Sequence, residues 1–197
     1  PLRLGGHSKG GNFAIYAGMY CEKCLRNQII AIYNNDGPGF SKDVVASAAY
    51  QNLLPVITTI VPESSVVGRL FEHQEEYIVI KSENRGLKQH DAMSWEVLGN
   101  HFVHAVTPAN QSLLANQAIR EWIALIPREK RKEIVEAVFQ ILDAAGIETV
   151  DDFLTLKLKD IRMIIQTKKK LPHETSDSIS DAAFLLIKIM IKTFTSS

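Results

Sequence analysis

The stretch Gly6-His7-Ser8-Lys9-Gly10 decides how this chain folds, because it places a G-x-S-x-G pattern between an extended segment and a helical one. That context predicts a nucleophile elbow, a turn so sharp that it strains the central residue and exposes its hydroxyl. Such a turn leaves almost no room for side chains beside the serine, which accounts for the two flanking glycines. Ser8 is therefore the candidate nucleophile. The alternative is a glycine-rich turn in which the serine is incidental.

Downstream of the elbow, the first 108 residues alternate short apolar runs with helical patterns, as the strand–helix–strand units of a parallel sheet do. An elbow within a parallel sheet is typical of the α/β-hydrolase fold. Since the chain starts with Pro1 and reaches the elbow after one strand, we expect the C-terminal part of that fold, with the N-terminal strands missing. We expect strands at residues 2–6, 29–33, 56–61 and 77–81, and helices at residues 13–25 and 41–54.

From residue 109 onward the sequence indicates helices only. This change predicts two regions, an α/β core over residues 1–108 and a helical C-terminal extension over residues 109–197. Pro127 is placed to start a helix and Gly146 to end one. The expected helices span residues 111–126, 128–145 and 177–194, with short ones near 151–156 and 161, and a solvated linker over 168–180.

A serine hydroxyl is a weak nucleophile at neutral pH, so it needs a histidine base and an acid that orients the histidine. In this fold the three residues follow in the order serine, acid, histidine. Asp36 lies in the polar loop after the second expected strand, and His90 lies in the loop after the fourth. Because parallel strands bring their carboxyl ends to one edge of the sheet, we expect Ser8, Asp36 and His90 to converge there.

Alternatives remain for both partners of the serine. Glu63 follows the third expected strand and is the rival acid, and the Asn34–Phe40 segment around Asp36 has the composition of a simple turn. Asp91 is expected to cap a turn or helix. The other histidines lie in the elbow, before the fourth strand, on an expected helix or in the tail, and are weaker candidates: His7, His73, His101, His104 and His173.

Lys9 follows Ser8 directly, at the turn that leads into the helix expected after the elbow. Backbone N–H groups at a helix start have no partner within the helix, and they stabilise negative charge that develops beside them. We therefore expect the N–H of Lys9 to act as an oxyanion donor.

Composition bears on partners and location. Lys plus Arg and Asp plus Glu both number 22, so no overall field of one sign favours nucleic acid or anionic lipid. No apolar run approaches the roughly 20 residues that span a bilayer, and no signal-peptide pattern is present, which favours a cytoplasmic protein.

Cys21 and Cys24 form one C-x-x-C without a second pair, so we expect free thiols and no metal or other cofactor. The expected absence of the N-terminal strands would leave one edge of the sheet open, and an open edge favours self-association.

Three segments together are similar to a known family: Gly6–Asn12, Asn34–Phe40, and Gln89-His90-Asp91 followed by Ser94-Trp95. They resemble the Mbeg1-like family of bacterial proteins of unassigned function, over about residues 1–150. The resemblance implies a lipase-type branch of the α/β hydrolases, in which Lys9 replaces a leucine frequent in lipases and Asp36 takes the acid position.

The sequence thus predicts a serine hydrolase that cleaves a carboxylic ester, with a small acyl ester or a lipid as substrate. Ser8 would attack, His90 would carry the proton and Asp36 would orient the imidazole. The alternative is a noncatalytic scaffold that uses the same fold as a binding or interaction module, since fold alone does not establish activity.

Overall fold

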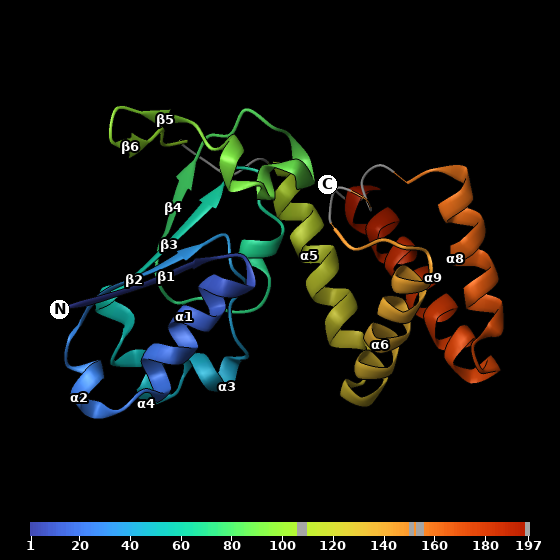
Figure 1. Cartoon of the computed structure of the whole chain (residues 1–197), viewed down its shortest axis with the longest axis horizontal. Helices are drawn as coiled ribbons and strands as arrows, with labels where there is room; N and C mark the ends of the chain where they lie inside the picture. Colours follow the sequence, from blue (N-terminus) through green and yellow to red (C-terminus); the bar gives the residue numbers. More distant parts are fainter. Residues whose placement is uncertain (106–109, 150–151, 153–155, 196–197) are drawn as a thin grey trace. The chain divides into compact units, whose positions relative to one another are not determined.

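A computed structural model describes residues 1–105, 110–149, 152 and 156–195. The chain divides into two compact units, Pro1–Gln117 and Ala118–Ser197. The first unit contains a parallel sheet with helices, and the second is helical (Figure 1). Among the described residues, none of the helices combines the length and the apolar character needed to cross a bilayer.

Four parallel strands form the sheet of the first unit, and their order in space is their order in sequence. They are β1 (Leu2–His7), β2 (Ile29–Asn35), β3 (Ile57–Pro62) and β4 (Tyr77–Ile80). The strands at β2 to β4 are rich in β-branched residues, which suit a pleated, buried surface. The expected parallel α/β architecture is confirmed, and the carboxyl ends of all four strands lie at one edge.

Helices α1 to α4 lie on one side of this sheet (Figure 1). A buried apolar cluster joins them to the strands, with Ile15 and Met19 of α1 packed against Ile32 of β2. The helix expected at residues 41–54 is broken at Ser47, whose hydroxyl accepts the N–H of Tyr50 as a helix cap does. The helices are α1 (Lys9–Tyr20), α2 (Lys23–Arg26), α3 (Lys42–Val45) and α4 (Ala48–Gln51).

The loops of the first unit hold short helical turns and one hairpin. The helix expected around His101 and His104 is wrong: Gly99, with φ of 65°, lets the chain reverse between β5 (Val97–Leu98) and β6 (His101–Phe102). Asp91 caps a helical turn as expected, because its carboxylate accepts the N–H of Met93. The 3-10 turns are η1 (Leu54–Val56), η2 (Val67–Arg69), η3 (Gly86–His90) and η4 (Ala92–Ser94).

The C-terminal region is helical, as expected, and its helices are α5 (Asn110–Leu125), α6 (Arg128–Ala144), α8 (Leu158–Lys170) and α9 (His173–Thr195). Pro127 immediately precedes α6, and Gly146, at φ of 69°, follows its end. The linker expected at residues 168–180 is wrong, because Lys168 to Lys170 form the last turn of α8, where cations stabilise the helix dipole. The short helix expected near 151–156 falls largely outside the described residues.

Candidate active site

Ser8 sits between the last residue of β1 and the first residue of α1 in a strained backbone conformation. Its φ is 57° and its ψ is −131°, a region that residues with a side chain rarely enter. Holding such a conformation costs about 1–3 kcal/mol, so the surrounding structure must impose it. The sharp strand-to-helix turn expected from the sequence is present, and it presents the half-buried Ser8 at the carboxyl edge of the sheet.

The close packing that imposes this turn involves Gly6 and Gly11. A Cβ at Gly6 would overlap the backbone of Gly10, and a Cβ at Gly11 would overlap Oδ1 of Asn34. At Gly10, by contrast, a Cβ would meet nothing within 4 Å. The expectation that both glycines flanking the serine are sterically required therefore holds for Gly6 but not for Gly10.

Three side chains from loops after β1, β2 and β4 form one hydrogen-bonded series. Nδ1 of His90 lies 2.7 Å from Oδ2 of Asp36, and Nε2 of His90 lies 2.9 Å from Oγ of Ser8. Because a carboxylate oxygen accepts, the Nδ1 atom carries the proton and Nε2 is left to accept the hydroxyl of Ser8. The structure therefore brings together the three residues that the sequence placed at this edge.

Asp36 is fully buried, and both of its carboxylate oxygens accept hydrogen bonds. While Oδ2 contacts His90, Oδ1 accepts the hydroxyl of Ser65 and the N–H of Gly68 at 3.2 Å. The backbone of Asp36 is itself strained, with φ of 52°. These contacts fix the carboxylate in one orientation toward the imidazole.

Glu63 and Lys9 are the other residues that the sequence proposed for this site. Glu63 follows β3 as expected, and its N–H donates to the carbonyl of Ile80, but the carboxylate that contacts His90 is that of Asp36. Lys9 is the first residue of α1, so its N–H lies in the helix turn beside Ser8. Nζ of Lys9 donates to Oδ1 of Asn12 at 3.2 Å.

Comparison with known proteins places this architecture in a family. The model of the Mbeg1-like family matches residues 1–140, which is more than half of the chain. The chain belongs to the Mbeg1-like family. Neither the curated proteins nor the solved structures contain a match to it.

Two residues of this Mbeg1-like chain hold the histidine loop, and sequence reasoning missed both. Nε2 of His7 donates to the backbone carbonyl of His90 at 2.6 Å, and the two imidazole rings lie 4.6 Å apart. Nε1 of the buried Trp95 donates to the carbonyl of Gln89 at 2.8 Å. The only sequence signal was their position, since His7 adjoins the serine and Trp95 lies in the segment after His90.

Asn34 and Asn12 tie the loop of Asp36 to the neighbouring elements. Fully buried Asn34 accepts the N–H of Gly37 at 3.0 Å and donates to the hydroxyl of Thr59 at 3.3 Å, on the adjacent strand. Nδ2 of Asn12 donates to the carbonyls of Pro38 and Gly39 at 3.0 and 3.1 Å. Asn12 belongs to α1, the helix that begins directly after Ser8. These hydrogen bonds therefore join the helix that follows Ser8 to the loop that carries Asp36.

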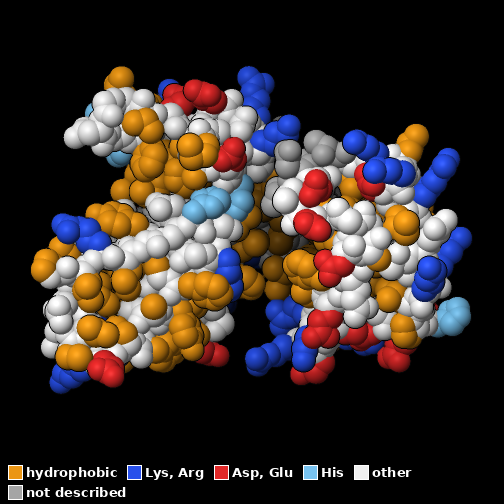
Figure 2. All heavy atoms as spheres, viewed as in Figure 1, with side chains coloured by type: hydrophobic (Ala, Val, Ile, Leu, Met, Phe, Trp, Pro, Cys, Tyr) orange, Lys and Arg blue, Asp and Glu red, His pale blue; other side chains and the backbone are white. Residues whose placement is uncertain are grey.

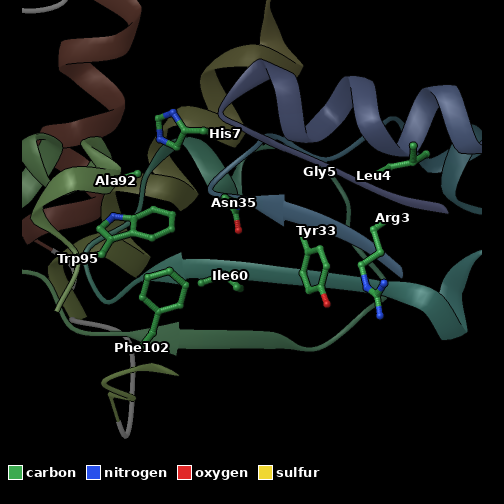
Figure 3. Close-up of a pocket in the computed structure, with 10 residues that line it drawn as sticks. All are labelled: Arg3, Leu4, Gly5, His7, Tyr33, Asn35, Ile60, Ala92, Trp95 and Phe102. Atoms are coloured by element: carbon green, nitrogen blue, oxygen red, sulfur yellow. The ribbon is translucent and has the colours of Figure 1, made fainter. Parts of the chain in front are cut away.

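A hollow of about 550 Å³ lies beside this site, on the sheet face opposite α1 (Figure 3). Its lining is mostly apolar, and His7, the residue next to Ser8, stands at one end of it. Figure 3 shows Tyr33 and Arg3 pointing into the hollow from β2 and β1. The lining residues are Arg3, Leu4, Gly5, His7, Tyr33, Asn35, Ile60, Ala92, Trp95 and Phe102.

Proposed function

We propose that this Mbeg1-like protein is a serine hydrolase of the α/β-hydrolase fold that cleaves carboxylic esters through an acyl-enzyme on Ser8. The observation that carries the proposal is the hydrogen-bonded series from Ser8 through His90 to Asp36. Two further features support it. The serine occupies a strained turn at a helix start, and the three residues follow in the chain order of that fold.

The geometry accounts for each step of an acyl transfer. Oγ of Ser8 attacks the ester carbonyl while Nε2 of His90 takes its proton, and Asp36 stabilises the resulting imidazolium. The backbone N–H of Lys9 donates to the carbonyl oxygen as it becomes negative. His90 then returns the proton to the alcohol that leaves. Water, activated by the same imidazole, hydrolyses the acyl-enzyme and restores Ser8.

The hollow beside His7 favours an ester whose acyl part is apolar. Side chains such as Ile60 and Phe102 provide an apolar surface within reach of the residue next to Ser8. Burial of apolar surface contributes roughly 25 cal/mol per Å², so a longer acyl chain that lies in the hollow should bind more tightly. We therefore expect p-nitrophenyl octanoate to be a better substrate than p-nitrophenyl acetate.

The proposal is tested with a fluorophosphonate probe, which reacts covalently with activated serines. We expect the unaltered chain to be labelled, the Ser8→Ala variant to be unlabelled, and the Ser41→Ala variant, altered at an exposed serine, to be labelled like the parent. Circular dichroism confirms that each variant is folded. Labelling that persists in Ser8→Ala, or a folded parent that is not labelled, would instead favour a noncatalytic binding scaffold.

A further inference from the structure

Helix α8 (Leu158–Lys170) exposes an apolar stripe to solvent. Leu158, Ile161 and Ile165 are 77%, 41% and 50% exposed. Their spacing of three and four residues places them on one face of the helix. In a protein of this size such a stripe normally packs against another element. None of the α8 side chains is buried, so the helix presents this stripe outward.

Cationic side chains run along α8 beside the stripe. Residues 157–170 contain six lysines or arginines and a single acidic residue, Asp160. Asp160 is already engaged at the helix start, where its carboxylate accepts the N–H of Lys157 at 2.9 Å. Arg162 and Lys169 are seven residues apart and so project from the same side of the helix, next to Ile165. Figure 2 shows lysine and arginine side chains gathered over this helix, with apolar side chains between them.

Among the described residues, cations of α6 form ion pairs with acidic side chains, whereas Arg162 and Lys169 of α8 do not. On α6, Lys130 lies 3.2 Å from Glu133, and Lys132 lies 3.8 Å from Glu136. Within the part of the chain that the structure describes, no ion pair involves Arg162 or Lys169. The overall balance of 22 cationic and 22 anionic residues therefore conceals a local positive excess on one exposed helix.

We propose that α8 is a docking face for an anionic lipid bilayer, with its axis parallel to the membrane surface. The stripe of Leu158, Ile161 and Ile165 enters the boundary between headgroups and acyl chains, while Arg162 and Lys169 contact lipid phosphates. Arginine and lysine suit this arrangement, because their methylene stems stay with the apolar layer and their charged ends reach the headgroups. A convex helix face that offers both kinds of side chain in adjacent rows matches a bilayer, which is soft and amphipathic. Docking does not depend on the chemistry proposed for Ser8, and it would bring the chain to a surface rich in acyl esters.

The experiment is co-sedimentation of the full chain with vesicles of phosphatidylcholine alone and with vesicles that also contain phosphatidylglycerol. We expect binding to the anionic vesicles and not to the neutral ones, with binding that weakens as sodium chloride rises. Each cation near an anionic membrane contributes about fivefold to binding, so Arg162→Gln with Lys169→Gln should lower partitioning at least about tenfold. Ile161→Gln with Ile165→Gln should also weaken binding, because it removes apolar surface that would enter the bilayer.

Matched controls come from α6, which also has exposed apolar side chains and cations. Val135→Gln with Phe139→Gln, and Arg128→Gln with Lys132→Gln, should leave vesicle binding unchanged. Circular dichroism checks that all four variants keep their helices. Failure of the parent chain to bind anionic vesicles would overturn the proposal, and so would equal losses in the α6 variants. Binding to soluble polyglutamate without any vesicle binding would also overturn it, and would indicate an acidic protein as partner.

Discussion

His7 and His90 are in direct contact: Nε2 of His7 donates to the backbone carbonyl of His90 at 2.6 Å, and their rings lie 4.6 Å apart. A carbonyl oxygen only accepts, so His7 is held with its Nε2 protonated. His7 adjoins Ser8 in the elbow, and His90 belongs to a loop more than eighty residues later. The residue beside Ser8 thus fixes the backbone of the histidine that we propose to activate this serine.

Replacement of His7 by phenylalanine should preserve ring packing but remove the donor to His90. Loss of one such hydrogen bond costs about 1 kcal/mol, so we expect the rate of fluorophosphonate labelling to fall roughly fivefold. His7→Gln, which restores an N–H donor, should recover part of the rate. His101→Phe, at an exposed histidine of the hairpin, is the control. Equal losses in His7→Phe and His7→Gln would contradict a role for the hydrogen bond.

Asp36 and Glu63 offer a test of which carboxylate orients His90. Asp36→Asn keeps the size of the side chain but replaces the acceptor of the Nδ1 proton, and in serine hydrolases this kind of change costs about 10⁴-fold in rate. We expect the labelling rate to fall at least about a thousandfold in Asp36→Asn and to stay near the parent value in Glu63→Gln. A large loss in Glu63→Gln would show that the acid lies one strand later than the hydrogen bonds indicate.

Gly10 and Gly11 are neighbours in α1 with opposite surroundings. Gly11→Ala would force its Cβ into Oδ1 of Asn34, which braces the loop of Asp36, so we expect lower thermal stability and slower labelling. Gly10→Ala meets open space in the first turn of α1, and alanine is more favourable than glycine in a helix, by up to about 1 kcal/mol in a helix interior. This variant should keep its labelling rate and melt at the same or a higher temperature. Thermal denaturation and probe labelling of the two variants would contradict the steric argument if Gly10→Ala were the more damaging one.

How far the sequence predicts the site depends on whether a residue is placed by topology or by packing. Ser8, Asp36 and His90 follow strands, and the geometry of a parallel sheet alone sends such loops to one edge. Their roles remain predictions that the labelling experiments test. The contacts of His7 and Asn34 arise when distant segments pack together, and no local pattern signals them. For the same reason the sequence does not show that Gly11, rather than Gly10, meets a neighbour.

The two errors in the fold predicted from the sequence have local physical causes. The hairpin after Trp95 depends on Gly99 at positive φ, a reversal that the surrounding apolar residues obscured in a helical reading. The lysines near residue 170 resemble a solvated linker in composition, yet they suit the last turn of a helix whose carbonyl end attracts cations. Both errors occur where a short segment is compatible with two conformations and neighbouring structure selects one.

A buried carboxylate away from the candidate site should make the first unit sensitive to acid. The side chain of Glu75 is 4% exposed and accepts hydrogen bonds from Tyr50 at 2.6 Å, from His73 at 3.0 Å and from Thr59. Burial by itself would raise the pKa of Glu75, but the bonds from His73, Thr59 and Tyr50 outweigh it and lower the pKa from 4.5 to about 2. Because the folded-state pKa is depressed, the stabilisation is complete above about pH 5 and is lost as the pH falls toward 2.

We expect this carboxylate to contribute on the order of 3 kcal/mol to the free energy of unfolding at neutral pH, and to lose most of it by about pH 2. Urea unfolding, followed by the fluorescence of Trp95 in a Trp122→Phe background, measures this in the first unit. Glu75→Gln should lower stability at pH 7 and flatten its decline in acid, whereas Glu76→Gln, at an exposed neighbour, should change neither. A Glu75→Gln variant that loses stability as steeply as the parent between pH 5 and pH 2 would show that other carboxylates carry the acid sensitivity.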